Sequence, residues 1–346
     1  MSDRSIFNAL KSHIAVNNEW LEQTRETILE PDLEIVDPHH HLWDFPGNRY
    51  LLDELLSDFS SGHNIVASVH TQCRSMYRSE GPEDMKPVGE TEFVNGIAAM
   101  SASGMYGKTV ACAGIIGATD LLLGEKVRPV LEAHMEAGGG RFRGIRPSVA
   151  WHESSEVRAL DIPSGILMDR RARDAIREIA RLELTLDLWC FFTQLDEVCD
   201  VARAFPNVKV IINHTGGPVG IGPYEGKEAE VYRQWKEKLI ALAALPNTYM
   251  KLGGLGMRYS GIKANYDAPP LGSIELAKRW ALYIHTAIDL FGPNRCMYES
   301  NFPVDKGVCS YHVLWNAFKR LSEHYSDAEK KMLFSQTALD VYSLNV

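Results

Sequence analysis

Short apolar runs alternate with amphipathic stretches along almost the whole chain. Eight of these runs are rich in Val, Ile and Leu and nearly continuous in apolar residues. This is typical of strands that are buried on both faces, and such strands usually form parallel sheets. The eight predicted strands cover residues 33–38, 64–72, 109–117, 142–149, 184–192, 208–214, 248–254 and 295–301.

Stretches with helical periodicity separate the predicted strands. They span residues 90–103, 126–137, 170–182, 195–205, 228–245 and 274–291, and two more, 309–325 and 327–344, close the chain. Eight strands that alternate with helices predict an α/β fold, the (β/α)8 TIM barrel; a doubly wound sheet is the alternative. No repeat or low-complexity linker interrupts the pattern, so we expect one barrel domain over residues 33–346. Residues 1–32 predict an N-terminal helical extension, with one or two amphipathic helices between residues 5 and 30.

Composition narrows the classes of function. The 346 residues carry a net charge of −9 and no basic block, which disfavours a nucleic-acid groove because phosphate binding needs clustered Lys and Arg. No run of about 18 uncharged apolar residues occurs, and the start of the chain lacks the apolar core of a signal peptide. The six cysteines are scattered without a CxxC pair, as is typical of reduced thiols. We expect a cytoplasmic protein with a small-molecule substrate and no nucleic-acid or membrane partner; a homo-oligomer stays open.

The predicted strands end in residues that can carry chemistry. In a parallel barrel the active site lies at the carboxyl ends of the strands, and four strands from distant parts of the sequence bring imidazole or carboxylate groups there. Strand by strand, the candidates are His39 and His41; His70 and Gln72; Arg146; Trp189 and Phe192; His214; Lys251; and Glu299, Asn301 and Asp305. Their convergence on one face is stronger evidence of a site than any single residue.

The stretch DPHHHLWD, residues 37–44, holds three consecutive histidines at the end of the first predicted strand. Because side chains alternate along a strand, His39 and His41 share a face and their Cα atoms lie roughly 6.6 Å apart. Both imidazoles could then reach one ion, as an HxH pair does when it chelates zinc. The alternative is two histidines that are merely hydrogen-bonded at a strand end. His40 must point the other way, into the packing behind the strand.

Four further residues have two interpretations each. His214 ends its strand in phase with positions expected to face inward. It is either functional, as a metal ligand or a substrate contact, or structural. Glu299 should also face inward, where a carboxylate is costly unless it is paired or bound to metal. Arg146 and Lys251 could hold a substrate carboxylate or polarise a carbonyl, or they could simply pair with Glu299 or Asp37.

Seven motifs together resemble one known family. They are DPHHHLWD, SVHTQCRSMYR, GETEFVNGIAAMSASG, GGGRFRGIR, NHTGGPVGIGPYEG, MKLGGLGM and RCMYESNFPVDK. In combination they are similar to amidohydrolase family 2, the TIM-barrel branch that includes sugar lactonases, pyrone-dicarboxylate lactonase and sulfomuconolactone hydrolase. The resemblance covers nearly the whole chain after about residue 33. It implies hydrolysis of a lactone, ester or amide, with a metal in some members and none in others.

Carried over by position, the resemblance assigns the family's HxH to His39 and His41, its strand 6 histidine to His214 and its strand 4 arginine to Arg146. Two positions depart from the pattern. The sequence FFTQL has Phe192 where many relatives have a histidine, and ESNFP has Asn301 where the superfamily has an aspartate. Both departures weaken a metal site, because Phe cannot ligate and Asn cannot act as a carboxylate base.

Two mechanisms therefore remain. A divalent metal, zinc in the first place and manganese as the alternative, could bind to His39, His41 and Glu299 with an open position for water. Without a metal, Asp305, Glu299 or His214 would be the base, and Arg146 would stabilise the oxyanion.

Three functions follow from these residues. The favoured one is a hydrolase that opens a small lactone or cyclic ester bearing a carboxylate or an aromatic group. In it, His214, Glu299, Asn301 and Asp305 are catalytic. The residues expected to contact substrate are His70, Gln72, Arg146, Trp189, Phe192 and Lys251. The alternatives are a decarboxylase of the same superfamily and a barrel that binds a ligand but has lost catalysis.

Overall fold

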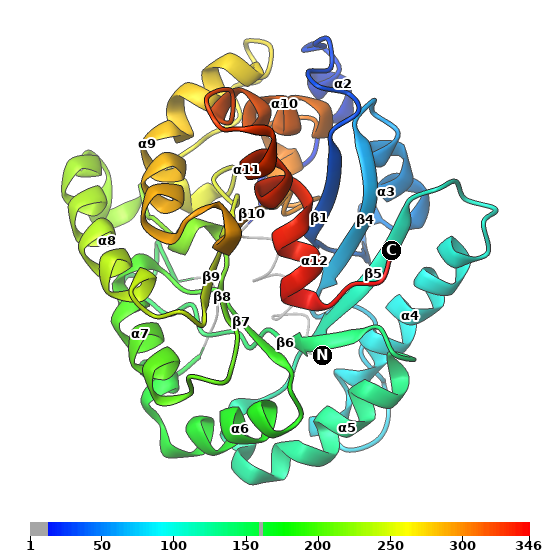
Figure 1. The fold of residues 1–346 in the computed structure, drawn as a ribbon, viewed down its shortest axis with the longest axis vertical. Helices are drawn as coiled ribbons and strands as arrows, with labels where there is room; N and C mark the ends of the chain where they lie inside the picture. Colours follow the sequence, from blue (N-terminus) through cyan, green and yellow to red (C-terminus); the bar gives the residue numbers. More distant parts are fainter. Residues whose placement is uncertain (1–12, 159–161) are drawn as a thin grey trace.

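A closed ring of parallel strands forms the centre of the computed structural model, which describes residues 13–158 and 162–346 (Figure 1). Within these residues eight strands pair in sequence order: β1 (Glu34–His40), β4 (Asn64–Thr71), β5 (Val110–Gly117), β6 (Phe142–Ile145), β7 (Thr185–Leu188), β8 (Val210–Ile212), β9 (Thr248–Leu252) and β10 (Cys296–Tyr298). Just beyond β10, Asn301 N donates to His39 O at 2.9 Å and His41 N donates to Phe302 O at 2.8 Å, which joins the last strand to the first. The predicted (β/α)8 barrel is confirmed.

An outer ring of helices covers the strands (Figure 1). In order they are α3 (Leu52–Phe59), α4 (Val88–Ala102), α5 (Arg128–Ala137), α6 (Arg170–Arg181), α7 (Leu195–Ala204), α8 (Glu228–Ala243), α9 (Ser273–Phe291) and α10 (Tyr311–Leu321). The helices predicted from periodicity agree with these bounds within a few residues. Helix α3 and the hairpin of β2 (Trp43–Phe45) and β3 (Asn48–Tyr50) were not predicted.

The end of the chain closes one side of the barrel. It forms α11 (Asp327–Lys331), a π-helical turn (Met332–Gln336) and α12 (Thr337–Tyr342), and α12 crosses in front of the strands in Figure 1. Its residues Val341 and Tyr342 join an apolar cluster with Val36, Ile211 and Met297. Val36 and Met297 precede His39 and Glu299 on their strands, so this cluster fills the amino-terminal end of the barrel. The polar side chains lie towards the carboxyl end.

The helical extension predicted over residues 1–32 falls partly on residues 1–12, which lie outside the described residues, so it stays a prediction. Among residues 13–32 the structure contains a single short helix, α2 (Asn18–Leu21), which Asn17 caps through its side chain. The following segment satisfies its polar groups with distant partners instead of a helix: Thr24 Oγ1 donates to Pro270 O at 2.7 Å, and Leu29 N donates to Asn316 Oδ1 at 2.9 Å. Tertiary hydrogen bonds thus anchor this segment.

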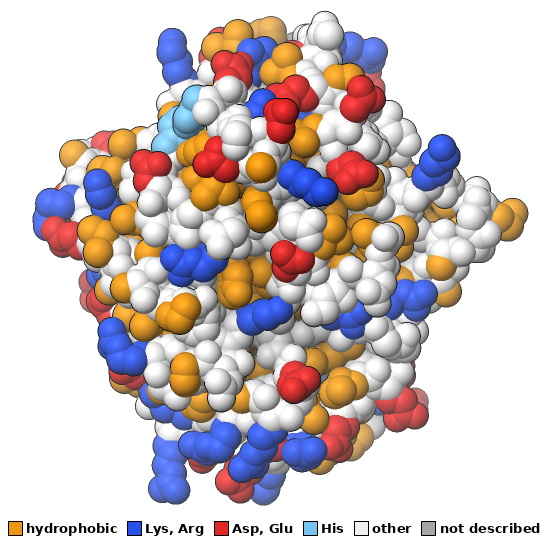
Figure 2. Space-filling view, viewed as in Figure 1, with side chains coloured by type: hydrophobic (Ala, Val, Ile, Leu, Met, Phe, Trp, Pro, Cys, Tyr) orange, Lys and Arg blue, Asp and Glu red, His pale blue; other side chains and the backbone are white. Residues whose placement is uncertain are grey.

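The surface agrees with the composition. Figure 2 shows basic and acidic side chains interspersed with apolar ones on the face crossed by α12, without a broad patch of one charge. Among the described residues no helix is long and apolar enough to cross a membrane. The six cysteines are free thiols, as their scattered positions predicted.

Candidate active site

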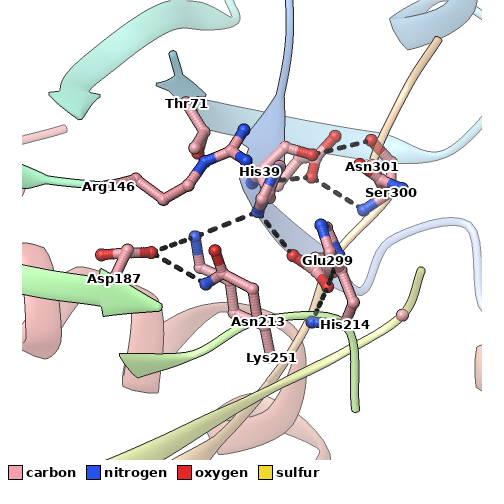
Figure 3. Close-up of polar contacts among 12 residues, drawn as sticks. His39, Thr71, Arg146, Asp187, Asn213, His214, Lys251, Glu299, Ser300 and Asn301 are labelled. Atoms are coloured by element: carbon pink, nitrogen blue, oxygen red, sulfur yellow. Dashed lines mark hydrogen bonds and ion pairs between the residues drawn. The ribbon is translucent and has the colours of Figure 1, made fainter. Parts of the chain in front are cut away.

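Polar side chains from separate strands meet inside the barrel just above the apolar cluster (Figure 3). Alternation along the strands directs Asn213 and Glu299 to the same side as Ile211 and Met297. His39 follows the register shift in β1, and His214 has a left-handed backbone conformation. The group is His39 of β1, Arg146 after β6, Asp187 of β7, Asn213 and His214 after β8, Lys251 of β9 and Glu299 after β10. All seven are buried, with exposed fractions of 7% or less.

The three consecutive histidines at the end of β1 point to two different sides of the strand. The register of β1 against β4 shifts between Asp37 and His40, and beyond this shift His39 and His41 place their rings 5.0 Å apart on one side. His40 turns to the other side, where its Nε2 lies 2.9 Å from Ser68 Oγ and its ring meets Phe59 edge-on. Both orientations agree with the prediction.

Glu299 links two of the inward-facing histidines. Its Oε1 accepts hydrogen bonds from His214 N at 2.9 Å and from His214 Nδ1 at 2.8 Å. Its Oε2 lies 2.7 Å from His39 Nδ1 but makes no hydrogen bond among the described residues. The carboxylate is fully buried, so half of its hydrogen-bonding capacity is unsatisfied in a place without bulk water.

The surroundings of His39 show why this oxygen is unsatisfied. Lys251 Nζ lies 3.3 Å from His39 Nδ1, and an ammonium group can only donate. That contact leaves Nδ1 as a lone pair facing the carboxylate oxygen Oε2. Burial, and then the nearby Lys251 charge, lower the pKa of His39 well below its ordinary value, so the ring is neutral. Two electron-rich atoms are thus in contact, with the Lys251 ammonium beside Nδ1 and Oε2 left without a hydrogen bond among the described residues.

The donor set fits a divalent metal. The ligand atoms of His39, His214 and Glu299 lie within 4.8 Å of one another, and His39 Nε2 has no partner among the described residues. Two imidazoles and one carboxylate are a ligand set of catalytic zinc sites, which keep a fourth position open.

His41, the second histidine of the HxH pattern, lies outside the group of His39, His214 and Glu299, and its predicted role as a metal ligand stays a prediction. Its Nδ1 donates to Thr71 O at 2.7 Å, and its Nε2 lies 3.3 Å from Asn301 Oδ1. Burial, followed by the Arg146 charge, lowers the pKa of His41 well below its ordinary value. The structure therefore groups His39 and Glu299 with His214, while His41 is directed to the loop after β10.

A buried ion pair lies beneath this group. Lys251 Nζ is 2.8 Å from Asp187 Oδ2, which also accepts from Asn213 Nδ2 at 3.1 Å and from the hydroxyl of Tyr342 at 2.8 Å. The sequence suggested Glu299 or Asp37 as the partner of Lys251, and this pairing is corrected to Asp187. The signal that could have revealed Asp187 is a lone carboxylate in the apolar strand LTLDLW, in phase with Trp189.

Arg146 has a buried guanidinium group without a counter-ion. Its Nη2 donates to Gln72 O at 2.6 Å, and Gln72 Nε2 donates to Arg146 O at 2.9 Å, so Gln72 fixes the arginine from both sides. In residues 13–158 and 162–346 no carboxylate oxygen lies within 4.0 Å of its nitrogens, and its Nε has no partner. Burial lowers the pKa of Arg146, yet a guanidinium stays charged. A buried positive charge of this kind suits an anionic ligand.

Asn301 and Asp305 form a unit on the loop after β10. Asn301 Nδ2 donates to Asp305 Oδ1 at 2.8 Å, and Gly256 N donates to Asp305 Oδ2 at 3.0 Å. Burial, reinforced by the Glu299 charge, nevertheless raises the pKa of Asp305 to about 8. Asp305 is therefore a neutral acid at pH 7 and a better proton donor than base.

The backbone is strained where the site requires it. His214 and Asn301 have φ values of 55° and 54°, in the left-handed region that costs non-glycine residues about 1–2 kcal/mol. The MKLGG motif lies against them: a Cβ on Gly254 would come within 2.4 Å of His214 Cβ, and one on Gly253 within 2.5 Å of Glu299 Cγ. Only glycines at these positions let β9 approach the histidine and the carboxylate.

Aromatic residues form one wall beside His214. The ring of Trp189 lies 6.1 Å from that of His214, and Phe191 and Tyr259 pack against it. The indole Nε1 of Trp189 is buried and has no hydrogen-bond partner among the described residues. This wall offers apolar contact and one unused donor.

Two expected substrate contacts lie elsewhere. Phe192 begins the 3-10 turn Phe192–Gln194 and is fully buried. The centre of its ring lies 5.1 Å from that of Tyr224. His70 faces α4, where its Nε2 is 3.5 Å from Glu90 Oε1, because Val69 and Thr71 occupy the inward positions of β4. A cavity of about 420 Å³ adjoins the site at Gln72.

Comparison with known proteins gives close agreement in length and fold. The family model described as Amidohydrolase matches residues 36–344. An uncharacterized protein of Sinorhizobium fredii is 31% identical over 334 residues, which cover 90% of this chain and 99% of that protein. The L-fucono-1,5-lactonase of Burkholderia multivorans is 23% identical over 320 residues, which cover 89% of this chain and 96% of the lactonase.

Solved structures share the barrel. A crystal structure of an amidohydrolase from Burkholderia multivorans with bound zinc has a TM-score of 0.66 at 23% identity and covers 90% of this chain and 99% of its own. A 2,6-dihydroxybenzoate decarboxylase from Rhizobium has a TM-score of 0.54 at 12% identity and covers 90% of this chain and 98% of its own. At these identities the two likenesses show the fold alone.

Proposed function

The chain belongs to the amidohydrolase family, and we propose that it is a metal-dependent hydrolase that opens a small lactone or cyclic ester bearing a carboxylate. The observation that carries the proposal is the buried, uncompensated guanidinium of Arg146 beside the group of His39, His214 and Glu299. The lactonase of Burkholderia multivorans supports the reaction class.

His39, His214 and Glu299 would hold the metal. When bound, a divalent cation would polarise the scissile carbonyl and lower the pKa of water. Zinc suits a set rich in imidazole better than manganese, which prefers oxygen ligands. His214 N continues to donate to Glu299 Oε1 whether or not the side chain ligates, so the carboxylate keeps its orientation.

The other residues bind and orient the substrate. The buried guanidinium of Arg146, which lacks a counter-ion, donates hydrogen bonds to the substrate's carboxylate. Trp189 contacts the substrate's ring and donates from Nε1 to one of its oxygens. Asp305 holds a proton at neutral pH. It is suited to return this proton to the alkoxide that leaves when the ester bond breaks. Hydrolysis then adds one water and yields a hydroxy acid, whose new carboxyl group releases a proton to the solution.

Without a metal, the same residues form a different catalytic pair. His214 Nδ1 donates to Glu299, which leaves Nε2 as the proton acceptor for a water molecule, with the base oriented by a carboxylate. The two mechanisms differ in their response to chelation.

A panel of lactones tests the proposal. Each is offered as a free carboxylate and as its methyl amide, and acid release is measured with chelated enzyme before and after zinc or manganese is restored. We expect turnover of carboxylated lactones that depends on metal. Turnover that survives complete removal of metal would replace the mechanism by the His214–Glu299 pair. Release of CO2 from aromatic acids in place of lactone opening would favour the decarboxylase, and binding without any turnover would favour the ligand-binding barrel.

A further inference from the structure

A second group of potential ligands lies on the outer side of β4, facing α4. It consists of His70 at the end of the strand, Cys73 just beyond it and Glu90 in the first turn of α4, and their ligand atoms lie within 4.8 Å of one another. His70 and Glu90 are buried, with exposed fractions of 0% and 2%, and Cys73 is partly buried. None of them takes part in the proposed hydrolysis.

The group contains several polar atoms that nothing satisfies. Both ring nitrogens of His70 and the Oε2 atom of Glu90 are buried without a hydrogen-bond partner among the described residues. Such atoms cost about 1–3 kcal/mol each when left alone. The other carboxylate oxygen, Oε1, accepts from Cys73 N at 2.7 Å and from Ser75 N at 3.4 Å. The carboxylate is thus held in place with one oxygen unused.

The distances match those around a tetrahedral ion. Zinc bonds of about 2.05 Å to nitrogen or oxygen and about 2.3 Å to sulfur place N and O ligands about 3.3 Å apart, and S and O about 3.6 Å apart. In the structure His70 Nε2 is 3.5 Å and Cys73 Sγ is 3.3 Å from Glu90 Oε1, the oxygen that also accepts from the two backbone N–H groups. The ion would bind this oxygen, or the unused Oε2 after a rotation of the carboxylate. An ion could therefore enter with small side-chain shifts.

We propose that His70, Cys73 and Glu90 bind a second divalent cation of the zinc class, behind the strand that carries the active-site histidines. Thiolate, imidazole and carboxylate together select zinc over magnesium or calcium, which prefer oxygen. This proposal does not depend on the proposed hydrolysis.

Binding exchanges a proton for the ion. Without it, the thiol of Cys73 donates towards Glu90 Oε1 at 3.3 Å and Leu42 O at 3.4 Å. Burial, and then the Glu90 charge, raise the pKa of Cys73 well above its ordinary value, so the thiol keeps its proton. Binding releases that proton to solvent, and the thiolate and carboxylate together neutralise the ion's two charges.

The bound ion would brace the active site from outside. The ring of His70 lies 5.9 Å from that of His40, the residue between the two inward-facing histidines, and Leu42 is two residues further along. One ion would therefore tie α4 to β4 and to the segment after it, directly behind the end of β1, as a structural zinc does.

Cobalt substitution tests the proposal on the full-length protein, because a cobalt–thiolate bond gives a near-ultraviolet charge-transfer band that imidazole and carboxylate ligands do not give. We expect the band in the wild type, in Glu299→Gln and in the matched control Cys199→Ser, and its loss in Cys73→Ser. Wild-type protein should also hold one more zinc per chain than Cys73→Ser, as measured by elemental analysis.

Two results would overturn the proposal: cobalt-loaded wild type without the band, or a band that Cys73→Ser retains. If Cys73→Ser does not fold, His70→Gln provides the test. This variant keeps Cys73 but loses one ligand, so the cobalt affinity, measured by titrating the band, should be at least tenfold weaker. An unchanged affinity in His70→Gln would likewise refute the site. Loss of lactone opening with the band intact would affect only the proposed function.

Discussion

Replacing Arg146 by methionine separates a functional cation from a structural one. Met keeps most of the apolar length of the side chain but removes the charge and the hydrogen bond from Nη2 to Gln72 O. If the guanidinium exists to bind a substrate carboxylate, its removal should harm catalysis and spare the fold. If it exists to hold the barrel together, the order is reversed.

The effect on stability can be bounded from the contacts. The lost hydrogen bond from a charged donor is worth about 1.5–3 kcal/mol, and relief from an uncompensated buried charge offsets this loss. A buried cation in a genuine ion pair would instead cost about 3–5 kcal/mol when removed. With an unfolding entropy of about 2.1 cal/mol/K per residue, the 346-residue chain shifts its midpoint by roughly 1.4 °C per kcal/mol. We therefore expect Arg146→Met to melt within about 2 °C of the wild type or above it, against a drop of about 4–7 °C for a structural cation.

The effect on catalysis follows from the lost anion contact. Two charge-assisted hydrogen bonds to a carboxylate contribute about 3–5 kcal/mol in a buried site, and each 1.4 kcal/mol is a factor of ten. We expect kcat/KM for a carboxylated lactone to fall by about 10²–10³, while kcat/KM for its methyl amide changes by less than about threefold.

The assay compares both substrates and the melting temperature in three proteins: wild type, Arg146→Met and the control Arg143→Met. Arg143 lies in β6, three residues before Arg146, and among the described residues its Nη1 donates only to the backbone oxygens of Gly140 and Phe142. Its substitution should therefore not discriminate between the substrates. An equal loss on both substrates, or a drop in melting temperature of more than about 4 °C, would refute the assignment of Arg146.

Three further substitutions test the rest of the site. Lys251→Met leaves Asp187 buried without its cation, so we expect a loss of about 3–5 kcal/mol and a melting temperature lower by about 4–7 °C; a change below 1 °C would contradict the ion pair. For Asp305, the folded pKa of about 8 exceeds the ordinary value of 3.8, so the folded state binds a proton that the unfolded chain has released. The stability of the wild type, relative to Asp305→Asn, should therefore fall as the pH rises from about 4 to about 8. Thermal melts of both proteins across this range measure the difference, and parallel plots of melting temperature against pH would exclude the buried acid. Glu299→Gln should weaken zinc binding by more than about 100-fold, as measured by competition with a chromogenic chelator, and unchanged affinity would remove Glu299 from the metal site.

The barrel could be predicted because its strands are buried on both faces. That burial gives continuous apolar runs such as VKVIINH, and the sequence contains eight of them at regular intervals. The hairpin after β1 escaped prediction because each of its strands has only three residues. Helix α3 was overlooked although its buried Leu52, Leu55 and Phe59 recur at helical spacing. Within residues 13–32, the residues Trp20 and Leu29 are anchored to the loop before α9 and to α10 by hydrogen bonds with partners some 250 residues or more away. Local periodicity cannot reveal such anchoring.

Much of the polar group could be predicted from strand ends and alternation, since His39, His41, Lys251 and Glu299 face inward as expected. The phase argument for His214 was wrong, because Ile211, not Val210 or Ile212, is the inward residue of β8, and a left-handed φ turns His214 to the site. Pairings were harder, because they depend on the register between strands that are distant in sequence. The partner of Lys251 is the clearest case. Asp187 comes from β7, two strands away, and no local pattern relates the two residues.

The orientation of His70 was predicted incorrectly for a simpler reason. Its neighbours Val69 and Thr71 occupy the inward positions of β4, so alternation alone would have turned His70 outward towards Glu90. The same rule separates Trp189, in phase with Asp187 and beside His214, from Phe192, which follows a break in the strand. Strand phase therefore predicts a candidate residue's place better than its distance from the strand end.

The most direct test of the account is a crystal structure of the protein grown with zinc, with anomalous scattering measured on both sides of the zinc absorption edge. The account predicts a zinc peak bounded by His39, His214 and Glu299, with the imidazoles displaced from their hydrogen-bonding distances to the carboxylate. A map of catalytically active crystals in which His214 still donates to Glu299 and His39 Nδ1 stays 2.7 Å from its Oε2, with no anomalous peak between them, would contradict it.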